Sequence, residues 1–434
     1  MFKDNLLATS KALKRKKSKP SKPLIQCDYE NCEFKEFDFN LAYYGLFRDG
    51  VYLNKCNIYE GINIRSYFSY WISHEQYGIN ILTKNVNLIN SNGVFLSKSI
   101  HISLDAMGGD NAPEIVVNGA AEAIIRHPNL KFSFFGDEKI LLPLIKPLKA
   151  LDNTNVIHTN EIIDANEKPG IAVRKGKNSS MSMAIQLVKS GEADAVVSAG
   201  NTGALMAMSK LILRPIEGIS RPAIAAYFPT IKGESCMLDL GANIECDSKN
   251  LVQFAFMGQA FARIVMGIKN PSISLLNVGE EEQKGLDYIK DASKILLSLK
   301  DTINYTGFIE GDKITQGQSD VIIADGFSGN VSLKTAEGTA RLVTFYLKQA
   351  LTSSLSSKIG YFFAKKAIND FRLHMDPRKY NGAVFLGLNG VAVKSHGGTD
   401  SYGFANAISV AVDMVQYNFI SDLRNVISKS ILNV

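Results

Sequence analysis

The chain has 434 residues, of which 46% are hydrophobic and 21% charged, proportions that suit a globular protein with a sizeable core. They exclude a disordered, collagen-like or disulfide-stapled protein. The net charge of +6 is too small to indicate a nucleic-acid binder, because basic residues concentrate in residues 1–22. Five cysteines, an odd number, favour free thiols in a reducing compartment. The sequence shows neither a secretory signal nor an apolar run near the ~18 residues of a membrane span.

The texture of the sequence changes near residue 98. Residues 1–98 are rich in Asn, Tyr, Lys and Phe and show no sustained periodicity, so we treat them as an N-terminal extension without an assigned function. Cys27 and Cys32 have no second Cys or His pair at zinc spacing downstream, which disfavours a metal site there. Residues 99–434 are expected to form one α/β domain.

That domain alternates apolar strands with helices in chain order. Pro113 follows a glycine turn and opens a helix that runs to about Arg126. Near-continuous apolar strands between helices indicate a three-layer αβα fold with a largely parallel sheet. We expect strands at residues 101–106, 131–136, 193–198, 237–240, 273–277 and 321–325.

Five of the turns that follow strands combine Gly with Asn, Ser, Thr or Asp. Ligands of α/β sheets bind beyond the carboxyl ends of the strands, so these turns are expected to converge on one sheet edge and to handle a phosphate or an oxyanion. Any one of them could be only a tight turn. No dinucleotide fingerprint, Walker A motif or serine-hydrolase elbow is present, and the histidines do not cluster as zinc ligands would. The turns are residues 105–110, 198–203, 239–243, 277–280 and 325–330.

The decapeptide LDAMGGDNAP at residues 104–113 resembles the opening signature of the bacterial phosphate acyltransferases, the PlsX family. Asn111 departs from the His that the family more often carries. The likeness covers about residues 100–430 but not the first 98. It continues at residues 198–205, 221–223, 239–243, 276–279, 284–285, 325–331 and 394–397.

The resemblance implies a fold related to phosphotransacetylases and isocitrate-type dehydrogenases, assembled as a homodimer. It implies an enzyme that needs no cofactor and no metal, and that converts inorganic phosphate and the fatty acyl thioester of acyl carrier protein to acyl phosphate. The product would pass to a membrane glycerol-3-phosphate acyltransferase in phospholipid synthesis. The enzyme would be cytoplasmic and peripherally associated with the inner face of the membrane.

The resemblance also implies site residues. Lys284 would supply a positive charge, and Asn330 an amide donor, to the phosphate and the oxyanion. Without the resemblance, we would interpret Lys284 as a solvated lysine and Asn330 as a helix N-cap. His396 could donate to phosphate or only brace its loop. Substrate contacts are expected at Asp105, Gly108, Gly109, Asp110, Gly200, Asn201, Thr202, Gly203, Asn243, Asp325, Gly326, Ser328, Lys394 and His396.

Residues 341–375 predict a basic helical hairpin with aromatic side chains near its tip. Such a hairpin suits the surface of an anionic membrane, with contacts from Ile359, Phe362 and Phe363. Burial of these side chains in a dimer is an equally good interpretation, and both can hold at once.

Three other functions remain open at this point. The first is an acyl-CoA phosphotransacetylase of related fold, which differs in its acyl donor. The second is a metal- and nicotinamide-dependent decarboxylating dehydrogenase, which would need clustered aspartates that the sequence does not show. The third is a non-catalytic membrane-interaction protein, against which the intact loops argue.

Overall fold

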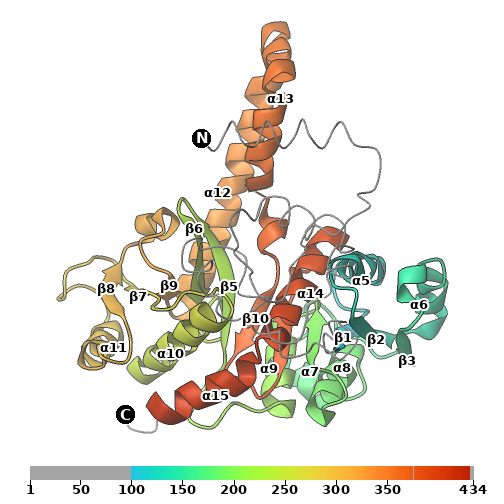
Figure 1. The fold of residues 1–434 in the computed structure, drawn as a ribbon, viewed down its shortest axis with the longest axis horizontal. Coiled ribbons are helices and arrows are strands. Elements are labelled where there is room, and N and C mark those ends of the chain that lie inside the picture. The colour runs from blue at the N-terminus through green and yellow to red at the C-terminus, as the bar shows by residue number, and fades with distance from the viewer. Residues whose placement is uncertain (1–98, 375, 431–434) are drawn as a thin grey trace, which may run out of the picture. The chain divides into compact units, whose positions relative to one another are not determined.

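The structure is a computed structural model that describes residues 99–374 and 376–430 (Figure 1). The predictions for the basic tail and for Cys27 and Cys32 lie outside these residues. In the described part of the chain, no helix combines the length and the apolar character that crossing a bilayer demands.

The described strands form one eleven-stranded sheet in the order β3-β2-β1-β4-β11-β10-β5-β6-β9-β7-β8. Seven of its ten pairings are parallel, as the sequence predicts. The strands are β1 Ile100–Asp105, β2 Leu130–Gly136, β3 Asn155–His158, β4 Ala195–Ser198, β5 Ala223–Thr230, β6 Gly233–Leu238, β7 Ile273–Leu276, β8 Tyr305–Ile309, β9 Val321–Ile323, β10 Ala383–Leu386 and β11 Val391–Lys394.

The three antiparallel pairings lie side by side in the middle of the sheet, between β11 and β10, β10 and β5, and β5 and β6. Three successive reversals leave β6, β9, β7 and β8 running opposite to β1, β2, β3, β4 and β11. The polar turns therefore divide between two opposite sheet edges, and the prediction of one shared edge is wrong. The sequence signal for this reversal is the two-residue connection between Thr230 and Gly233, because so short a turn can join only antiparallel strands.

Helices cover both faces of the sheet and bury one apolar cluster on each. The larger cluster includes residues of α5, α6, α10, α11, α14 and α15, and the smaller one residues of α7, α8 and α9. The helix predicted after Pro113 is confirmed as α5. The helices are α5 Glu114–Arg126, α6 Glu138–Ile145, α7 Pro169–Lys175, α8 Ser180–Ser190, α9 Thr202–Ile212, α10 Ser248–Ile264, α11 Asp287–Ser298, α14 Ser401–Gln416 and α15 Phe419–Ser430, with short 3-10 turns η3 Lys149–Leu151, η4 Gly311–Gln316 and η5 Pro377–Tyr380.

The predicted hairpin is present as α12 (Gly326–Thr352) and α13 (Leu355–His374), which extend away from the sheet (Figure 1). Its first arm begins earlier than residue 341, directly after β9. Within α12 only Gly326 and Gly329 are buried. Most of the hairpin's large apolar side chains therefore face outward in this chain: Leu342, Val343, Phe345, Tyr346, Leu355, Ile359, Phe362 and Phe363.

Candidate functional site

The first group of loops follows β1, β4 and β11, and a buried carboxylate organises it. Asp105 is 1% exposed and accepts hydrogen bonds from the hydroxyls of Ser180 and Ser198, both at 2.6 Å. Burial raises the pKa of Asp105, and the two hydroxyl donors oppose that rise. This side chain ties β1 to α8 and β4, so it supports the site rather than facing a ligand.

Glycines allow the first two loops to touch. A Cβ on Gly108 would lie 2.4 Å from Oδ2 of Asp105 and 2.8 Å from the amide nitrogen of Gly200. Gly109 has a φ of +114°, which L side chains rarely adopt. These glycines therefore shape the loops, as close backbone approach requires.

Asn201 caps α9 and leaves the helix start open. Its Oδ1 accepts from the N–H of Ala204 at 3.0 Å, and its Nδ2 donates to backbone carbonyls of the 164–167 segment. The side chain has no donor left for a substrate. The N–H groups of Thr202 and Gly203 have no hydrogen-bond partner among the described residues and are available to an anion.

Lys394 brings a buried positive charge to the same loops. The residue is 9% exposed, and its Nζ donates to the carbonyl of Ala199 at 3.1 Å and to that of Ser395. Burial lowers the pKa of Lys394 to about 8, and the charges of Asp105 and Asp110 oppose this.

His396 faces outward beside Lys394. Its Nδ1 accepts from the N–H of Gly398 at 3.2 Å, so a neutral ring carries its proton on Nε2. Burial, Lys334 and Lys394 lower the pKa of His396. The side chain of Asn381 accepts the backbone N–H of His396 at 2.9 Å. His396 can therefore offer one neutral Nε2–H donor to an anion, while the hydrogen bond to Asn381 holds its backbone in place.

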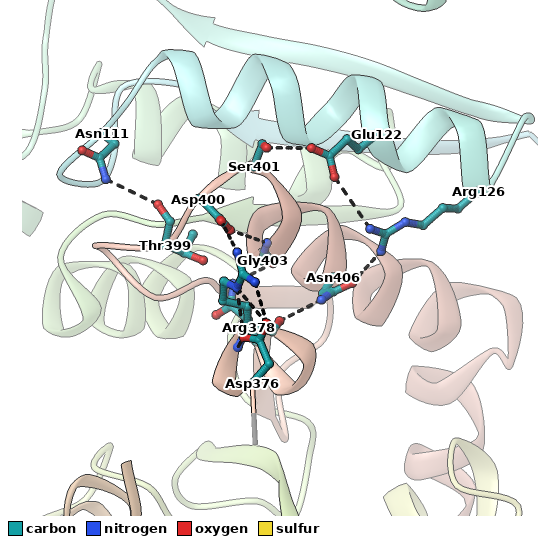
Figure 2. Close-up of polar contacts among 11 residues, drawn as sticks. Asn111, Glu122, Arg126, Asp376, Arg378, Thr399, Asp400, Ser401, Gly403 and Asn406 are labelled. Atoms are coloured by element: carbon teal, nitrogen blue, oxygen red, sulfur yellow. Dashed lines mark hydrogen bonds and ion pairs between the residues drawn. The ribbon is translucent and has the colours of Figure 1, made fainter. Parts of the chain in front are cut away.

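The far end of the His396 loop is anchored by the network in Figure 2. Asp400 caps α14 and accepts from Nη1 of Arg378 at 2.5 Å. Because Arg378 lies in η5, its bond to Asp400 joins η5 to the start of α14, and Arg378 also pairs with Asp376, the N-cap of η5. Ser401 donates to Glu122 of α5 at 2.6 Å. These exposed ion pairs add little to the stability of the fold, but together they hold the C-terminal end of the His396 loop in place.

The second group of loops follows β6, β9 and β7. Asp239, at the end of β6, is buried and accepts from the N–H groups of Ile224, Ala242 and Asn243 and from Nδ2 of Asn243, at 2.7–3.1 Å. Asn243 also donates to the carbonyl of Pro222 at 2.8 Å. Its side-chain donors thus serve the fold of the loop.

Asp325 is the N-cap of α12. It accepts from the N–H and the hydroxyl of Ser328, at 2.9 and 2.8 Å, and from the Tyr288 hydroxyl at 3.2 Å. The N–H of Gly326 donates to the carbonyl of Asn243 at 2.8 Å. Asp325, Gly326 and Ser328 therefore build the helix start. The alternative reading of Asn330 as the cap is wrong, because that position belongs to Asp325.

Asn330 and Lys284 keep their polar ends accessible. Asn330 is exposed, and no described residue forms a hydrogen bond with its amide. It lies against Gly241, where a Cβ would come within 3.5 Å of it. Nζ of Lys284 is 2.8 Å from Glu281, half of the side chain is exposed, and Glu281 raises the pKa of Lys284. Lys284 therefore carries its charge at neutral pH.

Helix α12 links the two groups of loops. It starts in the second group, and its residues Lys334 and Glu337 act electrostatically on His396 of the first. Asn330 lies one turn before Lys334, about 6 Å along the axis. Helix α12 therefore runs from the second group of loops, where it carries Asn330, toward His396 of the first group.

Sequence reasoning missed several supporting residues. Ser180 lies 75 residues from Asp105 and Asn381 lies 15 residues from His396, and no motif marks either of them. Lys334 could have been found, because it lies four residues after Asn330 on the same helix. Across residues 99–374 and 376–430, no three His, Cys, Asp or Glu side chains gather as a metal site would require.

Comparisons with known proteins show which family the chain resembles and which fold it shares. The family model described as "Fatty acid synthesis protein" matches residues 100–422. The phosphate acyltransferase of Rhodospirillum centenum is 53% identical over 335 residues, covering 77% of this chain and 94% of the relative. That of Paramagnetospirillum magneticum is 51% identical over 330 residues, covering 76% and 94%. A solved phosphotransacetylase from Streptococcus pyogenes, 20% identical with a TM-score of 0.50 over 79% of this chain and 98% of that one, has a similar fold.

Proposed function

Because the chain belongs to the PlsX family of phosphate acyltransferases, we propose that it transfers a fatty acyl group from acyl carrier protein to inorganic phosphate. Membership of this family decides against the dehydrogenase and the non-catalytic interpretations. The choice of acyl carrier protein over coenzyme A as donor belongs to the proposal.

In the proposed reaction, a phosphate oxygen attacks the thioester carbonyl and a tetrahedral oxyanion forms. Collapse of that intermediate breaks the carbon–sulfur bond, so acyl phosphate and the pantetheine thiolate leave. A thiolate is a good leaving group, which removes the need for a covalent enzyme intermediate. The protein has to position the phosphate and stabilise developing negative charge.

The free N–H groups of Thr202 and Gly203 and the Nε2–H of His396 support a phosphate subsite in the first group of loops. Lys284 is the candidate cation for the reacting phosphate and the oxyanion, and Asn330 is the candidate amide donor to the oxyanion. The observation that carries this assignment is the exposed amide of Asn330, which forms no hydrogen bond with any described residue and lies beside the Gly241 turn.

Release of free thiol, with and without phosphate, tests the reaction. Palmitoyl-acyl carrier protein and palmitoyl-CoA should be compared as donors at equal concentration. The proposal expects phosphate-dependent release from the first and little from the second. Preferential use of palmitoyl-CoA would favour the phosphotransacetylase alternative.

We further propose that the enzyme is a homodimer that binds an anionic membrane from the cytoplasmic side, so that acyl phosphate reaches a membrane glycerol-3-phosphate acyltransferase without crossing water. The hairpin supports this, because Ile359, Phe362 and Phe363 are 61%, 73% and 80% exposed beside Lys358, Lys365 and Lys366. Phe362→Ser with Phe363→Ser should weaken pelleting with anionic liposomes and leave soluble turnover intact. Loss of the dimer instead would favour the packing interpretation.

A further inference from the structure

The loop that carries Lys284 is closed by one buried amide. Asn277 follows β7 and is 7% exposed. Its Nδ2 donates to the carbonyls of Gly279 and Lys284, both at 3.0 Å, so it joins the two ends of the loop. The opposite orientation of the amide would turn Oδ1 toward two carbonyl oxygens. The hydrogen bonds therefore fix how the amide lies.

The oxygen atom of that amide has no hydrogen-bond partner among the described residues. Oδ1 of Asn277 is buried and accepts no hydrogen bond from any described residue. It faces Gly285, where a Cβ would lie 2.0 Å from Oδ1 and where φ is +94°. An unpaired buried acceptor costs folding free energy. This cost offsets part of the stability that the two hydrogen bonds of Nδ2 provide, so stability alone explains Asn277 poorly. The amide fits at this position only because residue 285 is glycine.

Asn277 connects Lys284 to the rigid sheet. The backbone N–H of Asn277 donates to the carbonyl of Ile309, at the end of β8, at 3.0 Å. The other polar contacts of Lys284 with described residues lie within its own loop: its N–H donates to the carbonyl of Glu281, and its Nζ pairs with the Glu281 carboxylate. The Lys284 side chain is half exposed, so few packing contacts hold it. The anchored backbone carbonyl of Lys284 therefore determines where its ammonium group can reach.

A second brace holds the loop from outside. Glu280 pairs with Lys313 of η4 at 2.6 Å. This ion pair is partly exposed and fixes only the middle of the loop. The position of residue 284 still depends on the amide at its own carbonyl.

We propose that Asn277 is a positioning residue that places Lys284 for acyl transfer. The inference rests on the proposed function, which assigns Lys284 to the reacting phosphate and oxyanion. Asn277 does not touch the substrate and acts only through the backbone of Lys284.

A double-mutant cycle on the full chain tests this. Asn277→Ala removes both donors, and a displacement of about 1 Å in a charged group can cost up to about 100-fold in turnover. We expect Asn277→Ala to lower turnover about 10- to 100-fold in the parent and less than about 2-fold in a Lys284→Ala background. Amide hydrogen exchange should quicken in residues 279–285 and remain unchanged elsewhere.

Asn389→Ala is the matched control, because the Asn389 amide also donates to two carbonyls, those of Arg214 and Pro215, in a different loop. It should leave turnover within about 2-fold of the parent. Equal losses from Asn277→Ala with and without Lys284 would overturn the inference alone. Unchanged turnover in Lys284→Ala itself would overturn the role of Lys284 and the inference with it.

Discussion

Removal of the Asn330 amide separates catalysis from folding unusually cleanly. The side chain is exposed and makes no hydrogen bond with any described residue, so its removal breaks no hydrogen bond of the described fold. Alanine is also the better helix former by up to about 0.7 kcal/mol. Asn330→Ala should therefore melt at the parent's temperature or slightly above it.

Turnover should respond very differently. Loss of one donor to a developing oxyanion typically costs about 10²–10³ in kcat, or roughly 2.7–4 kcal/mol. We expect Asn330→Ala to lose turnover by that factor in the thiol-release assay, with circular dichroism and melting unchanged.

Asp325→Ala provides the comparison. It removes the cap that Ser328 and Tyr288 contact, and loss of such a cap costs about 0.5–2 kcal/mol of stability. Asn330→Ala with normal turnover would refute the assignment. So would an Asn330→Ala protein that melts as low as Asp325→Ala.

Three further predictions follow from the same arrangement. Lys284→Ala should lower turnover and raise the KM for phosphate with little change in melting; unaltered phosphate kinetics would leave Lys284 as a solvated lysine. Between pH 8 and 10.5 the unfolded chain binds more protons at Lys394 than the fold does, because burial lowers its folded pKa to about 8, so stability should rise over that window. Lys394→Met should flatten that rise in denaturant titrations, and an unchanged slope would show that Lys394 is not the group responsible. A protein that starts near Leu96 should keep its activity and its dimeric mass. Loss of both, while the full-length protein is active, would show that the predicted domain boundary is wrong.

Six of the eleven strands were predictable, because each of those six is a short apolar run that ends in a small polar turn, whereas β3, β5, β8, β10 and β11 were not predicted. The direction of the strands was not, because β10 enters the sheet from near the end of the chain and reverses its neighbours. Apolar runs in parallel and antiparallel strands look alike when both faces are buried. Only the short turn between β5 and β6 carried the information.

The site was predictable as loops but not as individual side-chain roles. Glycine-rich turns such as residues 105–110 stand out in the sequence. The partners that occupy Asp105 and Asn201 lie elsewhere along the chain and become visible only after folding. Asn330 shows the converse, since its lack of a local partner is a property of the folded structure.

The central claim is that this chain moves an acyl group from acyl carrier protein to phosphate. Thiol release from palmitoyl-acyl carrier protein, followed with phosphate titrated from zero, measures it most directly. The account predicts release that saturates with phosphate and yields one palmitoyl phosphate for each thiol. Release at the same rate without phosphate, or palmitate as the sole product, would contradict it.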